Sequence, residues 1–62
     1  MISITLENTN NRGDFVTLIQ GVDKLWMTHK FNGKEIERVY EGNKLKETLN
    51  TLEEIGFEVV GN

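Results

Sequence analysis

Apolar residues recur with helical spacing near the C-terminal end of the chain. They are Leu45, Leu49, Leu52 and Ile55. A 3.6-residue period places all of them on one stripe of an amphipathic helix. Gly56 follows directly, and glycine takes the left-handed conformation that ends many helices without a steric penalty. We therefore expect a helix that begins after Asn43, a favourable N-cap residue, and ends at Gly56, with Phe57 packed against Leu52.

The remaining apolar residues are arranged as in strands. Ile2–Glu7 alternates apolar and polar residues, the pattern of a strand with one buried face. Residues 8–14 are rich in Asn, Gly and Asp, a composition typical of a loop. The predicted strands are Ile2–Glu7, Phe15–Gln20, Leu25–Phe31, Lys34–Tyr40 and Phe57–Val60.

The dipeptide Asn32-Gly33 is the strongest short-range signal in the chain. A type I′ turn needs positive φ at both central residues, and Asn-Gly accommodates this best. With these two residues as the turn, the hairpin has one mostly apolar face, and we expect the helix to cover the side of Leu25, Met27 and Tyr40. The other face would pair Lys30 with Glu35, Thr28 with Glu37 and Trp26 with Val39.

The elements follow one another in the order β-β-β-β-α-β. The expected fold class is α+β, a small antiparallel β-sheet packed on one α-helix, with the last strand beside an earlier one. Residues 1–62 contain no linker, repeat or low-complexity segment, so we expect one domain. A domain of this size buries only about 60% of the surface that its unfolded chain exposes, so self-association is the simplest additional source of stability.

The second predicted strand carries apolar side chains on both faces. Phe15 and Ile19 point one way, and Val16 and Leu18 point the other way. A turn of two or four residues near positions 22 and 23 would set the first pair beside Trp26. A turn of three residues would set the second pair there, and the sequence leaves open which pair faces the helix.

Either register leaves apolar side chains around Trp26 on the face without the helix. A contiguous exposed apolar patch usually marks a contact surface. We expect a protein partner or a second copy of the chain, as in a homodimer, to cover this patch. The alternative is that the first strand or the Asn-rich loop folds over it. The candidate partner-binding residues are Trp26, Val39, Phe15, Ile19 and Thr28.

Composition restricts the chemistry that the chain can perform. It contains no cysteine and a single histidine, so a disulfide and a structural zinc site are excluded. Its acidic residues lack the spacing of a calcium loop, and its glycines stand alone in turns instead of forming a phosphate loop. We therefore expect no cofactor and no metal site.

Catalytic groups are also scarce. Ser3 is the only serine and His29 the only histidine, and a hydrolytic site would need both beside a carboxylate. His29 falls on the apolar face of the hairpin, where a hydrogen-bonded imidazole at the edge of the core is the usual outcome. Glu35 and Glu37 lie with Lys30 on the other face of the hairpin, which we expect to be more exposed to solvent. We expect a protein that is not an enzyme and has no catalytic residue.

The net charge of −3, with both signs spread along the chain, argues against a dedicated nucleic-acid binder. The alternative function is single-strand binding by the hairpin 26–40, through basic and aromatic side chains. The hairpin side chains considered for this role are Lys24, Lys30, Lys34, Arg38, Trp26, Phe31 and Tyr40.

No segment approaches the ~20 apolar residues of a membrane span, and the N-terminus lacks the features of a signal peptide. We therefore expect a cytoplasmic protein.

The predicted helix is followed by Gly56-Phe57-Glu58-Val59-Val60. This ending resembles that of a family of short uncharacterised bacterial domains, which finish with a leucine-striped helix and Gly-Trp-Glu-Leu-Val. The resemblance covers residues 45–60, with Phe57 in place of tryptophan, and implies a small antiparallel sheet on one helix with no agreed activity. Compact acidic chains are also common among bacterial and phage accessory proteins, including inhibitors. The expected function is accordingly a non-enzymatic protein-interaction module of that kind.

Overall fold

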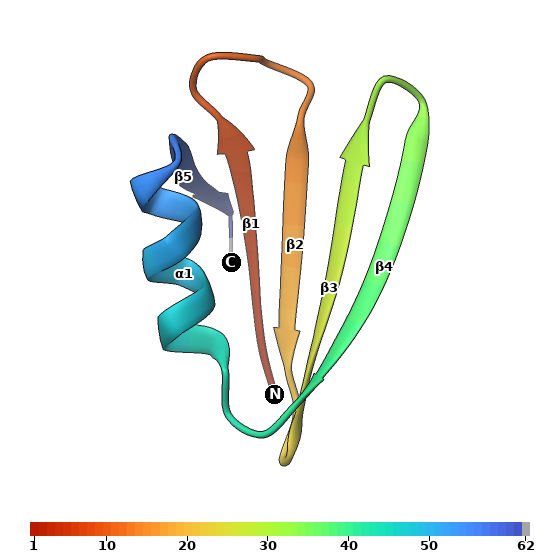
Figure 1. The fold of residues 1–62 in the computed structure, drawn as a ribbon, viewed down its shortest axis with the longest axis vertical. Coiled ribbons are helices and arrows are strands. Elements are labelled where there is room, and N and C mark those ends of the chain that lie inside the picture. Colours follow the sequence, from red (N-terminus) through yellow and green to blue (C-terminus); the bar gives the residue numbers. More distant parts are fainter. Residues whose placement is uncertain (62) are drawn as a thin grey trace.

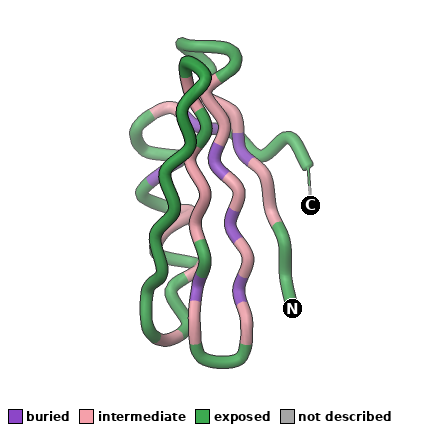
Figure 2. Tube along the Cα trace, turned by 90° about the vertical axis from the view of Figure 1, so that its right-hand side faces the viewer, coloured by how far each residue is buried: buried purple, intermediate pink, exposed green. Residues whose placement is uncertain are grey.

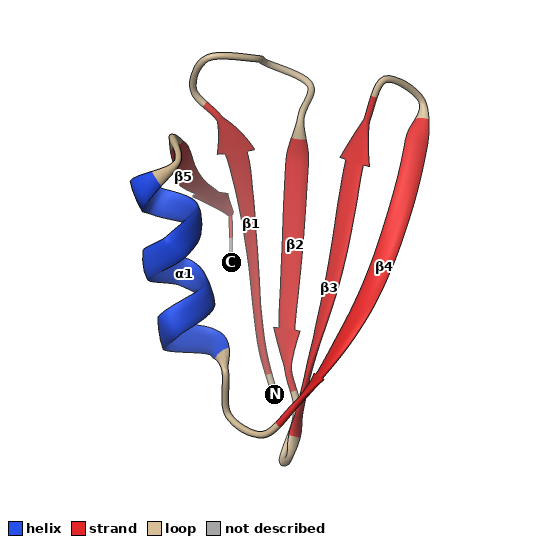
Figure 3. Cartoon of the chain, in the orientation of Figure 1, coloured by secondary structure: helices blue, strands red, loops and turns tan. Residues whose placement is uncertain are grey.

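The fold is an antiparallel five-stranded sheet with one helix packed on one side (Figure 1). A computed structural model of the chain describes residues 1–61. The strand order is β4-β3-β2-β1-β5, so β4 and β5 are the edge strands (Figure 3). This confirms the predicted α+β class and places the last strand beside β1. The elements are β1 (Ile2–Asn8), β2 (Phe15–Gln20), β3 (Lys24–Phe31), β4 (Lys34–Glu41), α1 (Leu45–Glu54) and β5 (Phe57–Gly61).

Two short turns set the register of the sheet. Asn32 and Gly33 have φ values of 50° and 74°, as a type I′ turn requires, and all three cross-strand pairs predicted for the second face of this hairpin are present. The turn between β2 and β3 has two residues, because the Gly21 N–H donates to the Lys24 carbonyl at 2.8 Å. Ile19 therefore lies opposite Trp26, which settles the question that the sequence left open.

The hydrophobic core lies between the sheet and α1. Buried positions alternate along the central strands (Figure 2), as the two-residue period of a strand predicts. Leu45 and Leu49 of α1 pack at the margin of this core. The buried apolar residues are Leu6, Val16, Leu18, Leu25, Leu52 and Phe57.

The C-terminal end of α1 forms as predicted, with one exception. Gly56 has a φ of +107°, its N–H donates to the Glu53 carbonyl at 3.2 Å, and Phe57 joins Leu52 in the core. The prediction was wrong for Ile55, which is 62% exposed. Three residues of a helix turn through roughly 300°, so Ile55 lies about 60° further around the axis than Leu52 and leaves the buried stripe.

The N-terminal end of α1 differs from the prediction. The N-cap residue is Lys44 and not Asn43, and no side chain of its own caps the helix. Gln20, at the end of β2, accepts the backbone N–H of Lys44 itself through Oε1 at 3.2 Å. The same buried side chain donates through Nε2 to Gly42 and to two carbonyls of the β2–β3 turn. A contact between distant parts of the chain thus satisfies one of the backbone donors at the helix start.

The helix covers only part of its side of the sheet. It packs against β5 and β2, leaving the β3–β4 hairpin beyond it (Figure 1). The predicted covering is therefore correct for Leu25, which is fully buried, and wrong for Tyr40, which is 38% exposed. The hydrogen bond from Lys44 to Gln20 joins the start of the helix to the end of β2, the central strand. Every residue of β4 is exposed, because alternate residues point away from the side of α1 and the others lie beyond the helix.

Candidate protein-interaction surface

The open face is the side of the sheet opposite α1, and it carries a row of apolar side chains across three strands. Trp26 lies directly between Ile19 of β2 and Val39 of β4. The side chains of Trp26 and Val39 are 41% and 54% exposed. Within residues 1–61, α1 is the one helix, and it lies on the other side of the sheet, so no helix of this part of the chain shields the row.

Trp26 is held in place by the glycine of the neighbouring turn. A Cβ atom built on Gly21 would lie 2.8 Å from Cζ3 of the indole, closer than such atoms approach one another in proteins. The ring therefore lies against the Gly21 backbone, as aromatic residues do beside glycines in sheets. A hollow of about 230 Å³ beside it is lined partly by Thr28 and Val39. An aromatic ring fixed before binding loses little conformational entropy in a complex.

The other two candidate residues lie further along the open face. Thr28 belongs to a row of threonines with Thr17 and Thr5. Phe15 lies one row beyond these threonines, opposite Lys30. The structure thus brings all five candidates to one face but divides them, since a polar row separates Phe15 from the apolar row. The apolar row is Ile19, Trp26 and Val39.

The segments that could have covered Trp26 lie elsewhere. β1 is a strand of the sheet itself, between β2 and β5. The Asn-rich loop is attached at the β1–β5 edge, because Arg12 contacts Glu7 and Glu58 at 3.0 and 3.1 Å. Hydrogen bonds to Glu58 and Glu7 raise the pKa of the Arg12 guanidinium above its usual value. Neither segment covers Trp26, which keeps its exposure.

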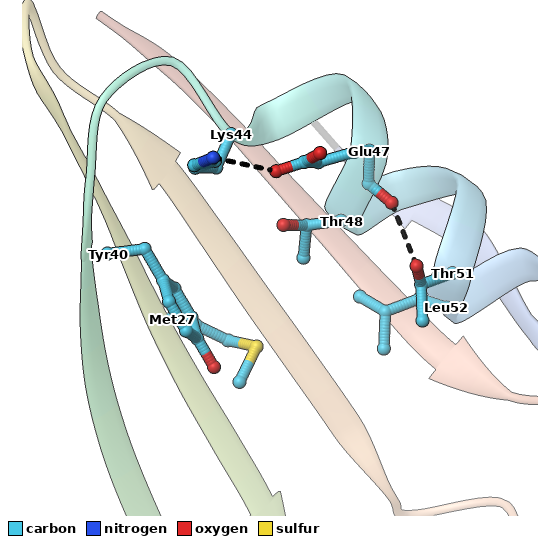
Figure 4. A pocket seen from close by; sticks show the side chains of 7 residues that line it. All are labelled: Met27, Tyr40, Lys44, Glu47, Thr48, Thr51 and Leu52. Carbon is cyan, nitrogen blue, oxygen red and sulfur yellow. Dashed lines mark hydrogen bonds and ion pairs between the residues drawn. The ribbon is translucent and has the colours of Figure 1, made fainter.

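A groove opens on the other side of the sheet, between α1 and the β3–β4 hairpin. Its volume is about 420 Å³. Met27 and Tyr40 form the hairpin wall, with Leu52 facing them from the helix (Figure 4). Lys44 and Glu47 form an ion pair at 3.2 Å at the start of the helix. The sequence did not predict this groove, because the helix was expected to lie over Tyr40.

His29 takes part in a polar network that attaches the loop to the sheet. Its Nε2 donates to Asp14 Oδ1 at 2.5 Å, and the other oxygen of Asp14 accepts from Asn8 at 3.1 Å. The imidazole also lies 4.6 Å from the Phe31 ring centre. This agrees with the expected hydrogen-bonded imidazole at the core edge. Ser3 lies on the open face opposite Ile19, so the serine is not brought to this histidine.

The hairpin side chains considered for nucleic-acid binding divide between the two faces. Alternate residues of a strand point to opposite sides, and Trp26 and Tyr40 accordingly lie on different faces of the sheet. Glutamates of β4 stand opposite residues of the basic strand β3 on the open face. No single face carries the whole set. The open face has Lys24, Trp26 and Lys30, and the other has Phe31, Lys34, Arg38 and Tyr40.

Across residues 1–61, no three His, Asp or Glu side chains are grouped so as to hold a metal ion. The helix within these residues is also too short and too polar to cross a bilayer.

No protein-family profile, curated protein or solved structure matches the chain. The resemblance of residues 45–60 to short bacterial domains stays a prediction. The functional proposal consequently rests on the geometry of the open face.

Proposed function

We propose that this chain is a non-enzymatic protein-interaction module whose contact surface is the open face centred on Trp26. The observation that carries the proposal is the half-exposed indole, held against Gly21 and flanked by Ile19 and Val39. Aromatic side chains at the centre of an interface contribute a large share of many binding energies. Trp26 would therefore be the main anchor for a partner.

The dimensions of the domain support a partner on this face. The accessible surface is 4310 Å², and a standard interface removes about 800 Å² from each partner, or about a fifth of that surface. A partner that binds the folded chain and not the unfolded chain also stabilises a small domain by mass action. The occupant is a second copy of this chain, as in a homodimer, or another protein.

The polarity of the face favours a transient complex over a permanent one. Interfaces between proteins that also exist separately have an apolar centre and a polar rim. Here the row at Trp26 is bordered by threonines, and Lys30 and Glu35 pair at 3.6 Å beyond them. A surface of this kind suits an accessory or inhibitory protein of bacteria or their phages. The proposal includes that role and a location in the cytoplasm.

The test compares two aromatic residues of the same hairpin. Trp26 and Tyr40 are 41% and 38% exposed but lie on opposite faces. Trp26→Ala should stay folded by circular dichroism and lose association, whereas Tyr40→Ala should keep it. Sedimentation velocity over a range of concentrations measures association with a second copy, and recovery of a purified partner measures association with another protein.

Two results would contradict the proposal. One is a folded Trp26→Ala variant with the mass and partners of the wild type. The other is an equal loss in both variants, because the effect would then not depend on the face.

A further inference from the structure

The outer edge of β4 carries backbone groups without a strand beside them. In a hairpin closed by a two-residue turn, the residues that flank the turn are hydrogen-bonded to each other, and every second residue then points its N–H and C=O outward. The Gly42 N–H, which donates to the Asp23 carbonyl at 2.6 Å, continues the same alternation at the far end. The outward groups therefore belong to Glu35, Glu37, Val39 and Glu41.

These residues also make the edge acidic. Their side chains point to the open face, because they lie opposite Lys30, Thr28, Trp26 and Lys24 of β3. Glu35 pairs with Lys30 at 3.6 Å. The ion pairs within residues 1–61 include neither Glu37 nor Glu41. The edge thus presents unpaired backbone and three glutamates on the open face, of which Glu37 lies opposite a neutral threonine and Glu41 opposite Lys24.

A second copy of β4 does not fit this edge. Two antiparallel copies related by a two-fold axis set residues of the same face opposite each other. Like charges in directly opposite positions destabilise a sheet. Every register that pairs many residues sets a glutamate opposite a glutamate. These registers are centred on Ile36, Glu37, Arg38 and Val39.

We propose that β4 accepts an extended segment of a basic protein partner as an additional strand, with Lys or Arg side chains facing its glutamates. The other side chains of that strand would lie on the side of Ile36, which is 40% exposed. In this mode of recognition, main-chain hydrogen bonds provide affinity and alternate side chains provide specificity. The inference rests on the proposed function and names the chemistry of its partner.

The position of Val39 connects the edge with the Trp26 row. Its backbone points outward from β4, and its side chain lies beside Trp26. A partner strand that sets an apolar side chain opposite Val39, and basic ones opposite the glutamates, would extend the apolar row by one strand. The same glutamates that discourage pairing of two copies would then select a basic partner.

The experiment uses two synthetic peptides with blocked ends, an alternating Lys/Val heptapeptide and an alternating Glu/Val heptapeptide. Each is added to the isotopically labelled full chain, and amide hydrogen exchange is followed by NMR. The Lys/Val peptide should slow exchange about tenfold or more at the outward amides of Glu35, Glu37, Val39 and Glu41. This is the change expected when a tenth or less of the protein molecules remain without bound peptide. The Glu/Val peptide should leave it unchanged. Equal slowing by both peptides, or by neither, would overturn the inference.

Variants separate the edge from overall charge. Glu35→Lys with Glu37→Lys should weaken binding of the Lys/Val peptide about tenfold. Glu53→Lys with Glu54→Lys changes the net charge equally at two exposed positions of α1, and should alter binding less than about twofold. An equal loss in both double variants would show a response to net charge alone and overturn the inference.

A backbone variant tests the hydrogen bonds themselves. Glu37→Pro removes one outward N–H and keeps the ladder to β3, a position where edge strands tolerate proline. A folded Glu37→Pro chain should lose the peptide, and undiminished binding would count against strand addition. The outcomes also distinguish the two proposals. If the Lys/Val peptide fails while Trp26→Ala still abolishes association, only the edge inference is wrong, and if Trp26→Ala leaves association intact, the proposed function fails regardless of the peptide.

Discussion

β2 and β4 are both regular antiparallel strands, yet their burial differs along their whole length. β2 alternates between buried and half-buried residues, whereas all eight residues of β4 are exposed. β2 lies at the centre of the sheet with α1 packed against it, while β4 lies at an edge beyond the helix. The difference indicates that the half under the helix provides most of the buried core, whereas β4 leaves its side chains in solvent.

The energetic contrast follows from the amount of apolar surface that each half removes from water. Fully burying a leucine side chain contributes about 1.5–3 kcal/mol, and Leu6 of β1 and Leu18 of β2 are both at 0% exposure. Val39 and Tyr40 keep a substantial part of their apolar surface in water. Substitutions should therefore affect folding in one half and association in the other.

The largest expected effect is the loss of Leu18. Leu18→Ala leaves a cavity in the core and should lower the free energy of unfolding by about 3 kcal/mol, most of the stability of so small a domain. Val39→Ala, at an exposed position of β4, should cost less than about 1 kcal/mol. Urea unfolding followed by circular dichroism measures both. Equal losses would contradict the division between the halves.

The next effect concerns the polar anchor of the helix. Gln20→Leu removes the acceptor of the Lys44 N–H and the donor to three carbonyls, so it should destabilise the chain by about 1–3 kcal/mol. Thr17→Val, in the same strand but on the open face, is the control and should change stability by less than about 1 kcal/mol. If Gln20→Leu unfolded at the wild-type urea concentration, the helix would be anchored in some other way.

A smaller effect is expected where the indole contacts the turn. Gly21→Ala places a Cβ atom 2.8 Å from the ring, so the indole must move. The cost should be about 1 kcal/mol, with shifted tryptophan emission and weaker association. Gly61→Ala introduces a Cβ with no atom within 4 Å and should leave both unchanged. Unaltered emission in Gly21→Ala would show that the glycine does not position Trp26.

The smallest effect is expected at the far edge of the open face. Arg12 is largely exposed, and its ion pairs join the loop to Glu7 and Glu58. Exposed pairs of this kind contribute about 0–1 kcal/mol, so Arg12→Ala should scarcely change thermal unfolding and should leave association intact. Loss of association would mean that the contact surface extends to the β1–β5 edge.

Much of the fold could be predicted because its signals are local. The bounds of β2 were predicted without error, and those of the other strands to within one residue. The turn at Asn32 and Gly33 and the helix end at Gly56 depend on backbone conformations that few residues adopt. Where the local residues permit only one backbone conformation, a single sequence is enough to predict it.

Apart from Ile55, whose exposure follows from its position around the helix axis, the errors involve contacts between distant residues. The role of Gln20 at the start of α1 replaced the expected cap at Asn43, and no local pattern marks it. The helix packs against β5 and β2 and away from Tyr40, which leaves the groove between them. The placement of the candidate site depended on the β2–β3 turn, whose residues Val22 and Asp23 do not specify a turn length. Once that turn is known, alternation alone places the candidates on one face.

The most direct test of the central claim uses the single tryptophan of the chain. Acrylamide quenching of Trp26 fluorescence should be compared between the dilute subunit and the associated form, either concentrated protein or a purified complex. The account predicts an accessible indole in the dilute subunit and a quenching constant reduced several-fold in the associated form. Equal quenching in both forms would contradict the claim that the open face at Trp26 is the contact surface.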